Sequence, residues 1–290
     1  MGKLFSLDFE IVPPEKAVVS VMDRSFLYGD SVYEVVRTYR GSVPFLLDRH
    51  FQRLCRSAER IRLKVPFTLE KLRDHINQCI SKASNSETYI RIVVSRGEDI
   101  RFDLAPGNHL RPQLVLLVDQ IKTFPKSFYD PGIHVALVSV RRNLREALDP
   151  NIKSGNYMNN VLALMEARDR GADDAVMLNA DGFVTEGTTS NVFIVQGGVV
   201  KTPKAEAGIL EGISRGLLKE IMTQGGIRFE EADFNEKEFL AADEIFLTGT
   251  VKELMPVARV NGQEVGKGSP GPMTHRLMEV WREEVERRTR

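Results

Sequence analysis

The chain has 290 residues, of which 42% are hydrophobic and 28% charged, and its 40 basic and 40 acidic residues cancel. This composition is typical of a globular protein long enough for two domains with sizeable cores. A chain without net charge has no overall field to attract nucleic acid or an anionic membrane, so we expect neither as a partner. No apolar run long enough to span a bilayer, no signal-peptide pattern and no paired-cysteine motif occur, so we expect a cytoplasmic protein.

The first part of the chain predicts a small α+β domain over residues 1–119. Alternating or continuous apolar runs indicate its strands, and apolar residues at helical spacing indicate its helices, the second with Thr68 as N-cap. The expected order is strand, hairpin, helix, helix, strand and strand, at residues 4–12, 32–47, 48–63, 68–83, 88–97 and 111–119.

A connector over residues 120–132 carries two prolines and a glycine without a clear period, which is typical of a domain boundary. Residues 133–290 then predict a large α+β domain. One of its helices starts at about Asn156, and its apolar face is expected to be formed by Val161, Leu162, Leu164, Met165 and Ala167. The repeated order of strands, helices and strands predicts two α+β lobes, with a ligand cleft between them.

Metal and nucleotide motifs are absent from the sequence. The five histidines are scattered, and there is no P-loop, nucleophile elbow or dinucleotide fingerprint, so we expect no metal. This leaves lysine and carboxylate chemistry. Lys153 stands between Ile152 and Ser154-Gly155 just before a helix, and Glu186 ends a strand.

Hydroxyl-bearing turns accompany these two residues. They lie at 188–190, at Ser214 beside a helix start, and at 248–250. Hydroxyls and free amides at a helix N-terminus can bind an anion. An amine, a carboxylate and a phosphate cradle are the parts that a pyridoxal phosphate enzyme needs.

Six stretches carry a specific resemblance from about Met22 to the C-terminus. They are DRSFLYGDSVYEVVR, HFQRLCRSAERI, NIKSGNYMNNVLALMEA, TEGTTSNVF, GILEGISR and FLTGTVKELMPV. In these stretches the chain resembles the class IV, or fold-type IV, pyridoxal phosphate-dependent aminotransferases. That family includes branched-chain aminotransferases, D-amino acid aminotransferases and aminodeoxychorismate lyases. The resemblance implies a two-lobe fold-type IV architecture, with the cofactor in the cleft between the lobes, and a homodimer.

The resemblance also implies roles for individual residues. Lys153 resembles the Schiff-base lysine and proton shuttle, Glu186 the partner of the pyridine nitrogen, and Arg53 the phosphate-binding arginine. Gly155 is expected to let the backbone approach the cofactor. Further cofactor contacts are implied for Tyr157, Ile213, Ser214 and Thr250. Substrate contacts are implied for Tyr28, Tyr33, Tyr89, Arg91, Arg101 and Val251.

The resemblance does not decide between the substrates of two subfamilies. Tyr28 and the run Tyr89–Arg91 resemble the branched-chain enzymes, whereas Arg101 resembles the carboxylate-binding arginine of the D-amino acid enzymes. Asp103 replaces that subfamily's usual histidine and would repel a carboxylate. The leading hypothesis is transamination between branched-chain or other apolar L-amino acids and 2-oxoglutarate. The alternatives are a D-amino acid transaminase, a lyase that releases pyruvate, and a non-catalytic cofactor-binding protein.

Overall fold

The computed structural model describes residues 2–266 and 270–290. The chain forms two compact units. Unit 1 comprises Met1–Lys122, Ile152–Asn156 and Thr289, and unit 2 comprises Thr123–Asn151, Tyr157–Arg288 and Arg290. The division after Lys122 lies inside the predicted connector. Lys153, which was expected in the large domain, belongs to unit 1.

Unit 1 is built on a six-stranded antiparallel sheet in the order β2-β1-β6-β5-β3-β4. Its strands are β1 (Leu4–Leu7), β2 (Glu10–Val12), β3 (Ser31–Tyr39), β4 (Val43–Pro44), β5 (Thr88–Ser95) and β6 (Gln113–Gln120). The expected single strand over 4–12 is a hairpin, because Asp8 and Phe9 adopt positive φ angles of 48° and 71° and turn the chain. The expected hairpin of β3 and β4 is confirmed.

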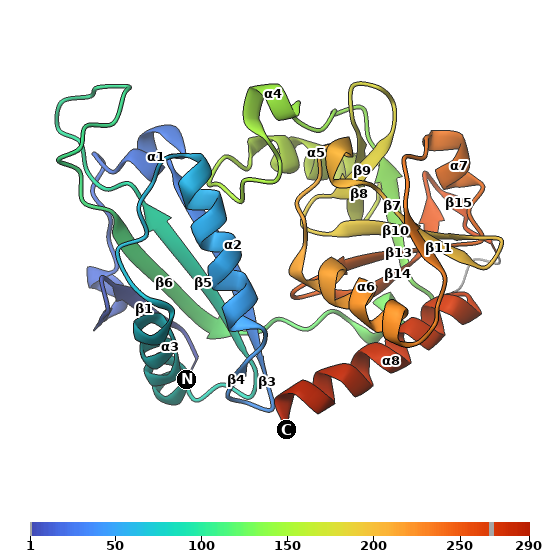
Figure 1. The fold of residues 1–290 in the computed structure, drawn as a ribbon, viewed down its shortest axis with the longest axis horizontal. Helices are drawn as coiled ribbons and strands as arrows, with labels where there is room; N and C mark the ends of the chain where they lie inside the picture. The colour runs from blue at the N-terminus through green and yellow to red at the C-terminus, as the bar shows by residue number, and fades with distance from the viewer. Residues whose placement is uncertain (1, 267–269) are drawn as a thin grey trace. The chain divides into compact units, whose positions relative to one another are not determined.

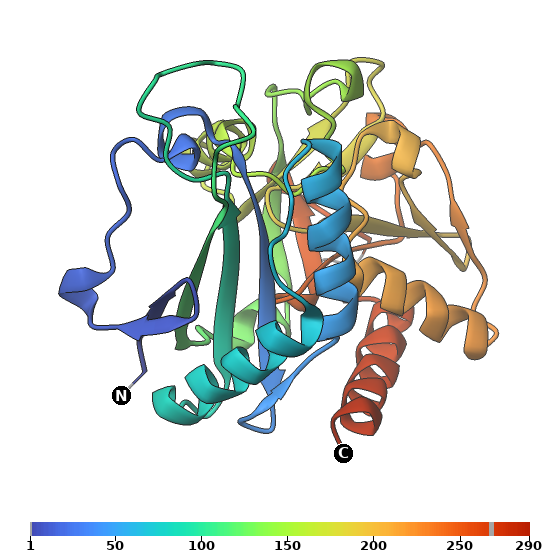
Figure 2. The ribbon, with the colours of Figure 1, turned by 60° about the vertical axis from the view of Figure 1, so that its left-hand side comes forward.

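Two helices, α2 (Leu47–Arg60) and α3 (Leu69–Ala83), cover one face of this sheet, as Figures 1 and 2 show. The short helix α1 (Arg24–Tyr28) and the 3-10 helix η1 (Pro14–Lys16) belong to the same unit. Leu54 of α2 and Leu72 of α3 share one core with Ile90 of β5. Because side chains alternate along a strand, Tyr89 and Arg91 point to the opposite face and are only partly buried.

Unit 2 is built on a nine-stranded mixed sheet. Its strands are β7 (Ile133–Leu137), β8 (Asp174–Leu178), β9 (Val184–Gly187), β10 (Asn191–Gln196), β11 (Val199–Thr202), β12 (Phe229–Glu231), β13 (Glu244–Gly249), β14 (Glu253–Val260) and β15 (Gln263–Glu264). Strand β9 pairs with both β8 and β10, so β10, β13, β14, β7, β8 and β9 form a closed ring. The helices are η2 (Lys126–Phe128), α4 (Arg145–Leu148), α5 (Met158–Asp169), η3 (Ala205–Ala207), α6 (Ile213–Gln224), α7 (Glu236–Leu240) and α8 (Pro272–Thr289).

The predicted apolar face of α5 is wrong, and the helix begins at Met158 rather than at about Asn156. Of the five residues expected to be buried, only Ala167 is. Ala163 and Ala167 pack against Ala136 of β7 and Ala175 of β8, so small residues bring the helix close to the sheet. The larger apolar residues therefore face outward, with exposed fractions of 66% for Met158, 44% for Val161, 48% for Leu162 and 58% for Met165.

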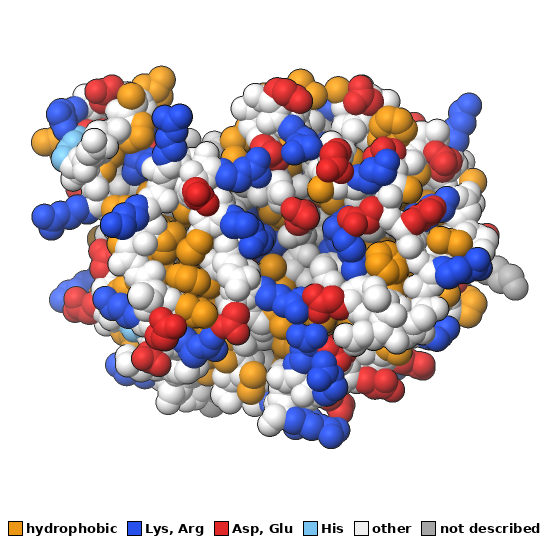
Figure 3. All heavy atoms as spheres, viewed as in Figure 1, with side chains coloured by type: hydrophobic (Ala, Val, Ile, Leu, Met, Phe, Trp, Pro, Cys, Tyr) orange, Lys and Arg blue, Asp and Glu red, His pale blue; other side chains and the backbone are white. Residues whose placement is uncertain are grey.

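The surface agrees with the balanced composition. On the face shown in Figure 3, acidic and basic side chains are interspersed. No helix within residues 2–266 and 270–290 is both long and apolar enough to cross a bilayer. Cys55 and Cys79 are free thiols.

Candidate active site

Lys153 is held in unit 1 because its segment pairs with the start of β3. Tyr33 N donates to Lys153 O at 2.9 Å, and Gly155 N donates to Ser31 O at 2.9 Å. Lys153 N donates to Ser57 Oγ of α2 at 3.1 Å. A Cβ on Gly155 would lie 2.5 Å from Ser31 Oγ. This close approach to β3 requires a glycine here, and the expected approach of the backbone to a cofactor stays a prediction.

The side chain of Lys153 lies on the ring of Tyr33. Lys153 Nζ is 3.4 Å from Tyr33 Oη and 4.4 Å from the ring centre. The guanidinium carbon of Arg91 lies 4.0 Å from the centre of the same ring. Both cations are attracted to the ring electrons. Unit 1 thus brings together a lysine amine and a guanidinium beside one buried tyrosine, and Tyr89 shares the face of β5 that carries Arg91.

Arg53 is anchored from behind by a buried carboxylate. Its Nε donates to Glu34 Oε1 at 2.6 Å, and its second terminal nitrogen donates to Oε2 at 2.8 Å. His50 Nδ1 lies 2.7 Å from the same Oε2. Burial alone would raise the pKa of Glu34, but the charge and hydrogen bonds of Arg53, aided by His50, hold it well below its usual value. Burial lowers the pKa of His50, against the opposing pull of Glu34, so the imidazole is neutral at neutral pH.

This cluster gives a pH-dependent stability. We expect Glu34→Gln to lower the free energy of unfolding at pH 7 by about 3 kcal/mol or more, because it removes one partner of a buried ion pair. The folded pKa of Glu34 lies below its unfolded value of about 4.3, so its contribution is present at neutral pH and is lost as the pH falls below that value. Urea unfolding at several pH values should show the difference from wild type shrinking in acid. A pH-independent difference, or an equal loss in the exposed control Glu10→Gln, would contradict this.

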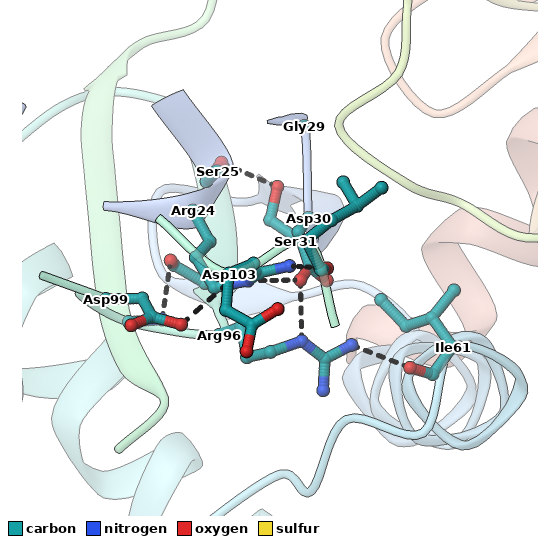
Figure 4. A network of polar contacts seen from close by, with 12 residues as sticks. Arg24, Ser25, Gly29, Asp30, Ser31, Ile61, Arg96, Asp99 and Asp103 are labelled. Atoms are coloured by element: carbon teal, nitrogen blue, oxygen red, sulfur yellow. Dashed lines mark hydrogen bonds and ion pairs between the residues drawn. The ribbon is translucent and has the colours of Figure 1, made fainter. Parts of the chain in front are cut away.

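The predicted substrate residue Tyr28 ends the short helix α1. Arg24 of this helix bonds to Asp30 and to the loop that carries Asp103 (Figure 4). Arg24, buried in α1, donates from Nε to Asp30 Oδ2 at 2.9 Å. Its two terminal nitrogens donate to the backbone oxygens of Asp103 at 2.6 Å and Leu104 at 2.8 Å. Its guanidinium carbon also lies 4.9 Å from the centre of the Tyr28 ring. Arg24 therefore fixes the loop after β5 against α1.

Arg101 lies on this same loop and is exposed. Its guanidinium contacts His109, with 2.7 Å between a terminal nitrogen and Nε2. Its backbone N donates to Asp99 Oδ1 at 3.1 Å. The side chain of Asp103, expected to repel a carboxylate here, is exposed. Arg101 is thus paired with a histidine that the sequence spacing did not reveal, whereas Lys153 and Arg91 both contact Tyr33.

In unit 2, Glu186 is buried at the end of β9 with both oxygens bound. Arg142 donates from Nε to Oε1 at 2.9 Å, and a terminal nitrogen lies 2.8 Å from the same atom. Leu210 N donates to Oε2 at 2.9 Å, and Asn191 Nδ2 donates to it at 3.4 Å. The other terminal nitrogen of Arg142 donates to Asn159 Oδ1 at 2.9 Å. The fork of Arg142 stabilises the ionised form of the carboxylate.

The start of α6 provides free amides in the same unit. Gly212 precedes Ile213 and gives no side-chain cap, so the amides of the first turn, including that of Ser214, have no partner within the helix. A Cβ at Gly212 would lie 2.0 Å from Asn191 Oδ1, so only glycine fits this turn. Asn191 also donates to Leu210 O at 2.8 Å, which ties the helix start to the strand beside Glu186.

Two buried hydroxyls complete this part of unit 2. In the sheet, Asn191 of β10 lies opposite Glu186 of β9 on one side and opposite Thr248 of β13 on the other. Ser190 Oγ and Thr248 Oγ1 are buried without a hydrogen-bond partner in the described part of the chain. Thr250 follows in the turn after β13. A buried anionic carboxylate, uncapped amides and unused hydroxyls fit a ligand with a cationic ring nitrogen and a phosphate, as pyridoxal phosphate has.

The predicted residues are divided between the units. Unit 1 carries Tyr28, Tyr33, Arg53, Tyr89, Arg91, Arg101 and Lys153, and unit 2 carries Tyr157, Glu186, Ile213, Ser214, Thr250 and Val251. Sequence reasoning missed Glu34, His50 and Arg142. The first two had signals, namely a glutamate inside an apolar strand and a histidine three positions before Arg53 on one helix face. Arg142 lies in a loop and had none.

Comparison with known proteins identifies similar chains. Residues 31–260 match the family model for amino-transferase class IV. The putative branched-chain-amino-acid aminotransferase of Methanocaldococcus jannaschii is 36% identical over 278 residues, 96% of this chain and 94% of that one. The D-alanine aminotransferase of Staphylococcus haemolyticus is 34% identical over 295 residues and all of both chains.

Solved structures agree with these relatives. The branched-chain aminotransferase from Thermoproteus uzoniensis with norvaline superposes with a TM-score of 0.90 at 34% identity, covering 98% of this chain and 95% of that one. The branched-chain amino acid aminotransferase from Thermobaculum terrenum, in its PLP-bound holo form, gives a TM-score of 0.87 at 29% identity, covering 98% and 94%. The expected fold-type IV α+β architecture is confirmed by these neighbours.

Proposed function

Since this chain belongs to the class IV aminotransferases and is a pyridoxal phosphate-dependent aminotransferase, we propose that it moves amino groups from branched-chain or other apolar L-amino acids to 2-oxoglutarate. The observation that carries the substrate assignment is the contact of Arg91 and Lys153 with one buried Tyr33. A guanidinium beside the reactive amine can bind the second carboxylate of 2-oxoglutarate. The ring of Tyr89, on the face of β5 that carries Arg91, suits an aliphatic side chain.

The proposed cofactor contacts follow from the donors in each unit. Bound pyridoxal phosphate supplies an electron sink that eases loss of the proton from the α-carbon of the amino acid. Lys153 Nζ would hold the cofactor and carry that proton. Glu186, kept ionised by Arg142, would accept a hydrogen bond from the ring nitrogen. The remaining contacts are assigned to Arg53, Tyr157, Ile213, Ser214 and Thr250.

The proposed substrate contacts begin with the α-carboxylate, which the backbone amides of Thr250 and Val251 would bind. Arg91 would bind the distal carboxylate of the second substrate, while Tyr28 would line the apolar side. Arg101 would be a secondary contact. Both substrates carry an α-carboxylate, and backbone amides can donate hydrogen bonds to either one, so one turn can serve both half-reactions.

Steady-state kinetics with single amino donors and 2-oxoglutarate test the substrate. We expect kcat/KM for L-leucine and L-valine to exceed that for D-alanine and D-glutamate by on the order of 100-fold, because stereoisomers present their α-hydrogen differently to one fixed base. Chiral analysis of the glutamate formed gives a second readout. Equal or higher values for the D-amino acids would overturn this assignment, and pyruvate released without an added 2-oxoacid would indicate the lyase.

A D-amino acid transaminase is the second candidate, favoured by the pairing of Arg101 with His109. The guanidinium of Arg101 lies exposed on this loop, with His109 beside it, and can bind a carboxylate. Under this alternative Arg101→Met would abolish activity. Under the branched-chain assignment, it would change kcat/KM for L-leucine less than about tenfold.

We also propose a homodimer in the cytoplasm. Its support is the exposed apolar face of α5, formed by Met158, Val161, Leu162 and Met165, because a monomer rarely exposes such a patch. The two free thiols suit a reducing compartment. Sedimentation at micromolar concentration should give about twice the chain mass of 32.7 kDa, and a single-chain mass would contradict the dimer.

A further inference from the structure

Two turns of unit 2 lie side by side at the end of its sheet. One is Thr188–Ser190, after β9, and the other contains Thr250 and Val251, after β13. They approach so closely that a Cβ at Gly249 would lie 3.1 Å from Thr189 O. Their mutual position is therefore fixed by contacts rather than by a flexible linker.

Lys252 spans the gap between these turns. Its Nζ donates to Asp174 Oδ2, in a short contact, and to Thr189 Oγ1 at 3.0 Å. Asp174 is the first residue of β8 and is buried. Its other oxygen accepts hydrogen bonds from Thr188 Oγ1 and from Ala175 N. One buried carboxylate thus holds the first turn directly and the second through Lys252.

Asp174 is ionised at neutral pH. Burial would raise the pKa of Asp174, but the charge and hydrogen bond of Lys252, with that of Thr188, lower it below its usual value. Tyr129 Oη donates to Lys252 O at 3.2 Å, so the backbone of Lys252 is held as well as its side chain. Because Lys252 directly follows Val251, these two anchors restrict the preceding amides.

We propose that Lys252 and Asp174 are positioning residues that brace the Thr250–Val251 turn, and thereby set the affinity of the enzyme for the α-carboxylate of its substrates. The inference rests on the proposed function of that turn. It assigns this residue pair a role through the turn rather than through contact with substrate or cofactor. Its role follows from the contacts of Lys252 with both turns and with Asp174.

The brace has a kinetic signature. The amino donor and the 2-oxoacid both carry a carboxylate next to the reacting carbon, so one turn would bind both. Loss of an interaction that is equal in the ground and transition states raises KM without lowering kcat. We therefore expect Lys252→Met to raise KM for L-leucine and for 2-oxoglutarate by a similar factor of about 10, with kcat within about threefold of wild type.

A matched control and a binding measurement separate positioning from general damage. Lys204→Met removes an exposed lysine with a surface partner, Asp233, in the same unit, and it should leave both KM values unchanged. Calorimetry with 4-methylpentanoate, which has the skeleton of leucine without its amino group, reports carboxylate binding without turnover. Lys252→Met should weaken this binding by the same factor of about 10.

A double variant keeps the test valid if Lys252→Met folds poorly. Lys252→Met with Asp174→Asn removes both charges, so no buried carboxylate is left without its partner. We expect the Tm of the double variant to return toward that of wild type, while its affinity for 4-methylpentanoate stays as low as that of Lys252→Met. Unchanged affinity in the folded double variant, or a rise in KM for only one of the two substrates, would overturn the brace. A wild-type protein that fails to transaminate would overturn the proposed function instead, and the calorimetric comparison would still test the brace.

Discussion

Replacing Lys153 by alanine should lower kcat/KM for transamination by on the order of 10⁴-fold or more, because we propose that the amine is both the covalent anchor and the proton carrier. The fold should survive, since the hydrogen bonds that place this segment on β3 and α2 use the backbone of Lys153. The exposed control Lys64→Ala should match wild type. The measurement is the rate of glutamate formation from L-leucine and 2-oxoglutarate. Residual activity within tenfold of wild type would contradict the assignment.

Replacing Glu186 by glutamine should lower kcat by on the order of 10²- to 10³-fold, because an amide cannot stabilise a positive ring nitrogen as a carboxylate does. The side chain keeps its shape, so KM should change less than kcat. The measurement is the kcat of the purified variant beside that of Glu230→Gln, an exposed glutamate of the same unit.

The variant also leaves Arg142 beside a neutral group, which costs stability. Glu186→Gln combined with Arg142→Met separates the two effects. The double variant should recover part of the lost Tm while kcat stays low. Recovery of kcat together with the Tm would show that Glu186 has only a structural role.

Local patterns predicted much of unit 1. Thr68 starts α3 as expected, with its Oγ1 accepting from Lys71 N at 3.3 Å, because capping depends on neighbouring residues alone. The strands β5 and β6 were expected from their apolar runs for the same reason. The hairpin of β1 and β2 was missed because its turn residues, Asp8 and Phe9, adopt positive φ although neither is a glycine. The sequence there contains no Asn-Gly or similar pair that would predict a turn.

Features that depend on distant contacts could not be predicted in this way. Lys153 joins unit 1 through pairing with residues 120 positions away, at Tyr33. The orientation of α5 depends on Ala163 meeting the alanines of β7 and β8, and the helix pattern itself favoured the larger side chains. In both cases the partner surface determined the outcome.

The candidate site shows the same division. Lys153 and Glu186 were singled out from their positions beside a helix start and a strand end, Arg53 was singled out by motif resemblance, and the catalytic roles of all three stay predictions. The residues that hold them were found only in the structure: Glu34 behind Arg53, and Arg142 behind Glu186. Supporting side chains come from separate elements, so their spacing in the sequence carries no motif.

The most direct test of the central claim is the visible absorbance of the purified protein with pyridoxal phosphate, recorded before and after adding one amino acid at a time. We expect a cofactor band that requires Lys153, that changes on adding L-leucine or L-valine, and that returns on adding 2-oxoglutarate. A band that survives Lys153→Ala unchanged, or one that no amino acid alters, would contradict the central claim.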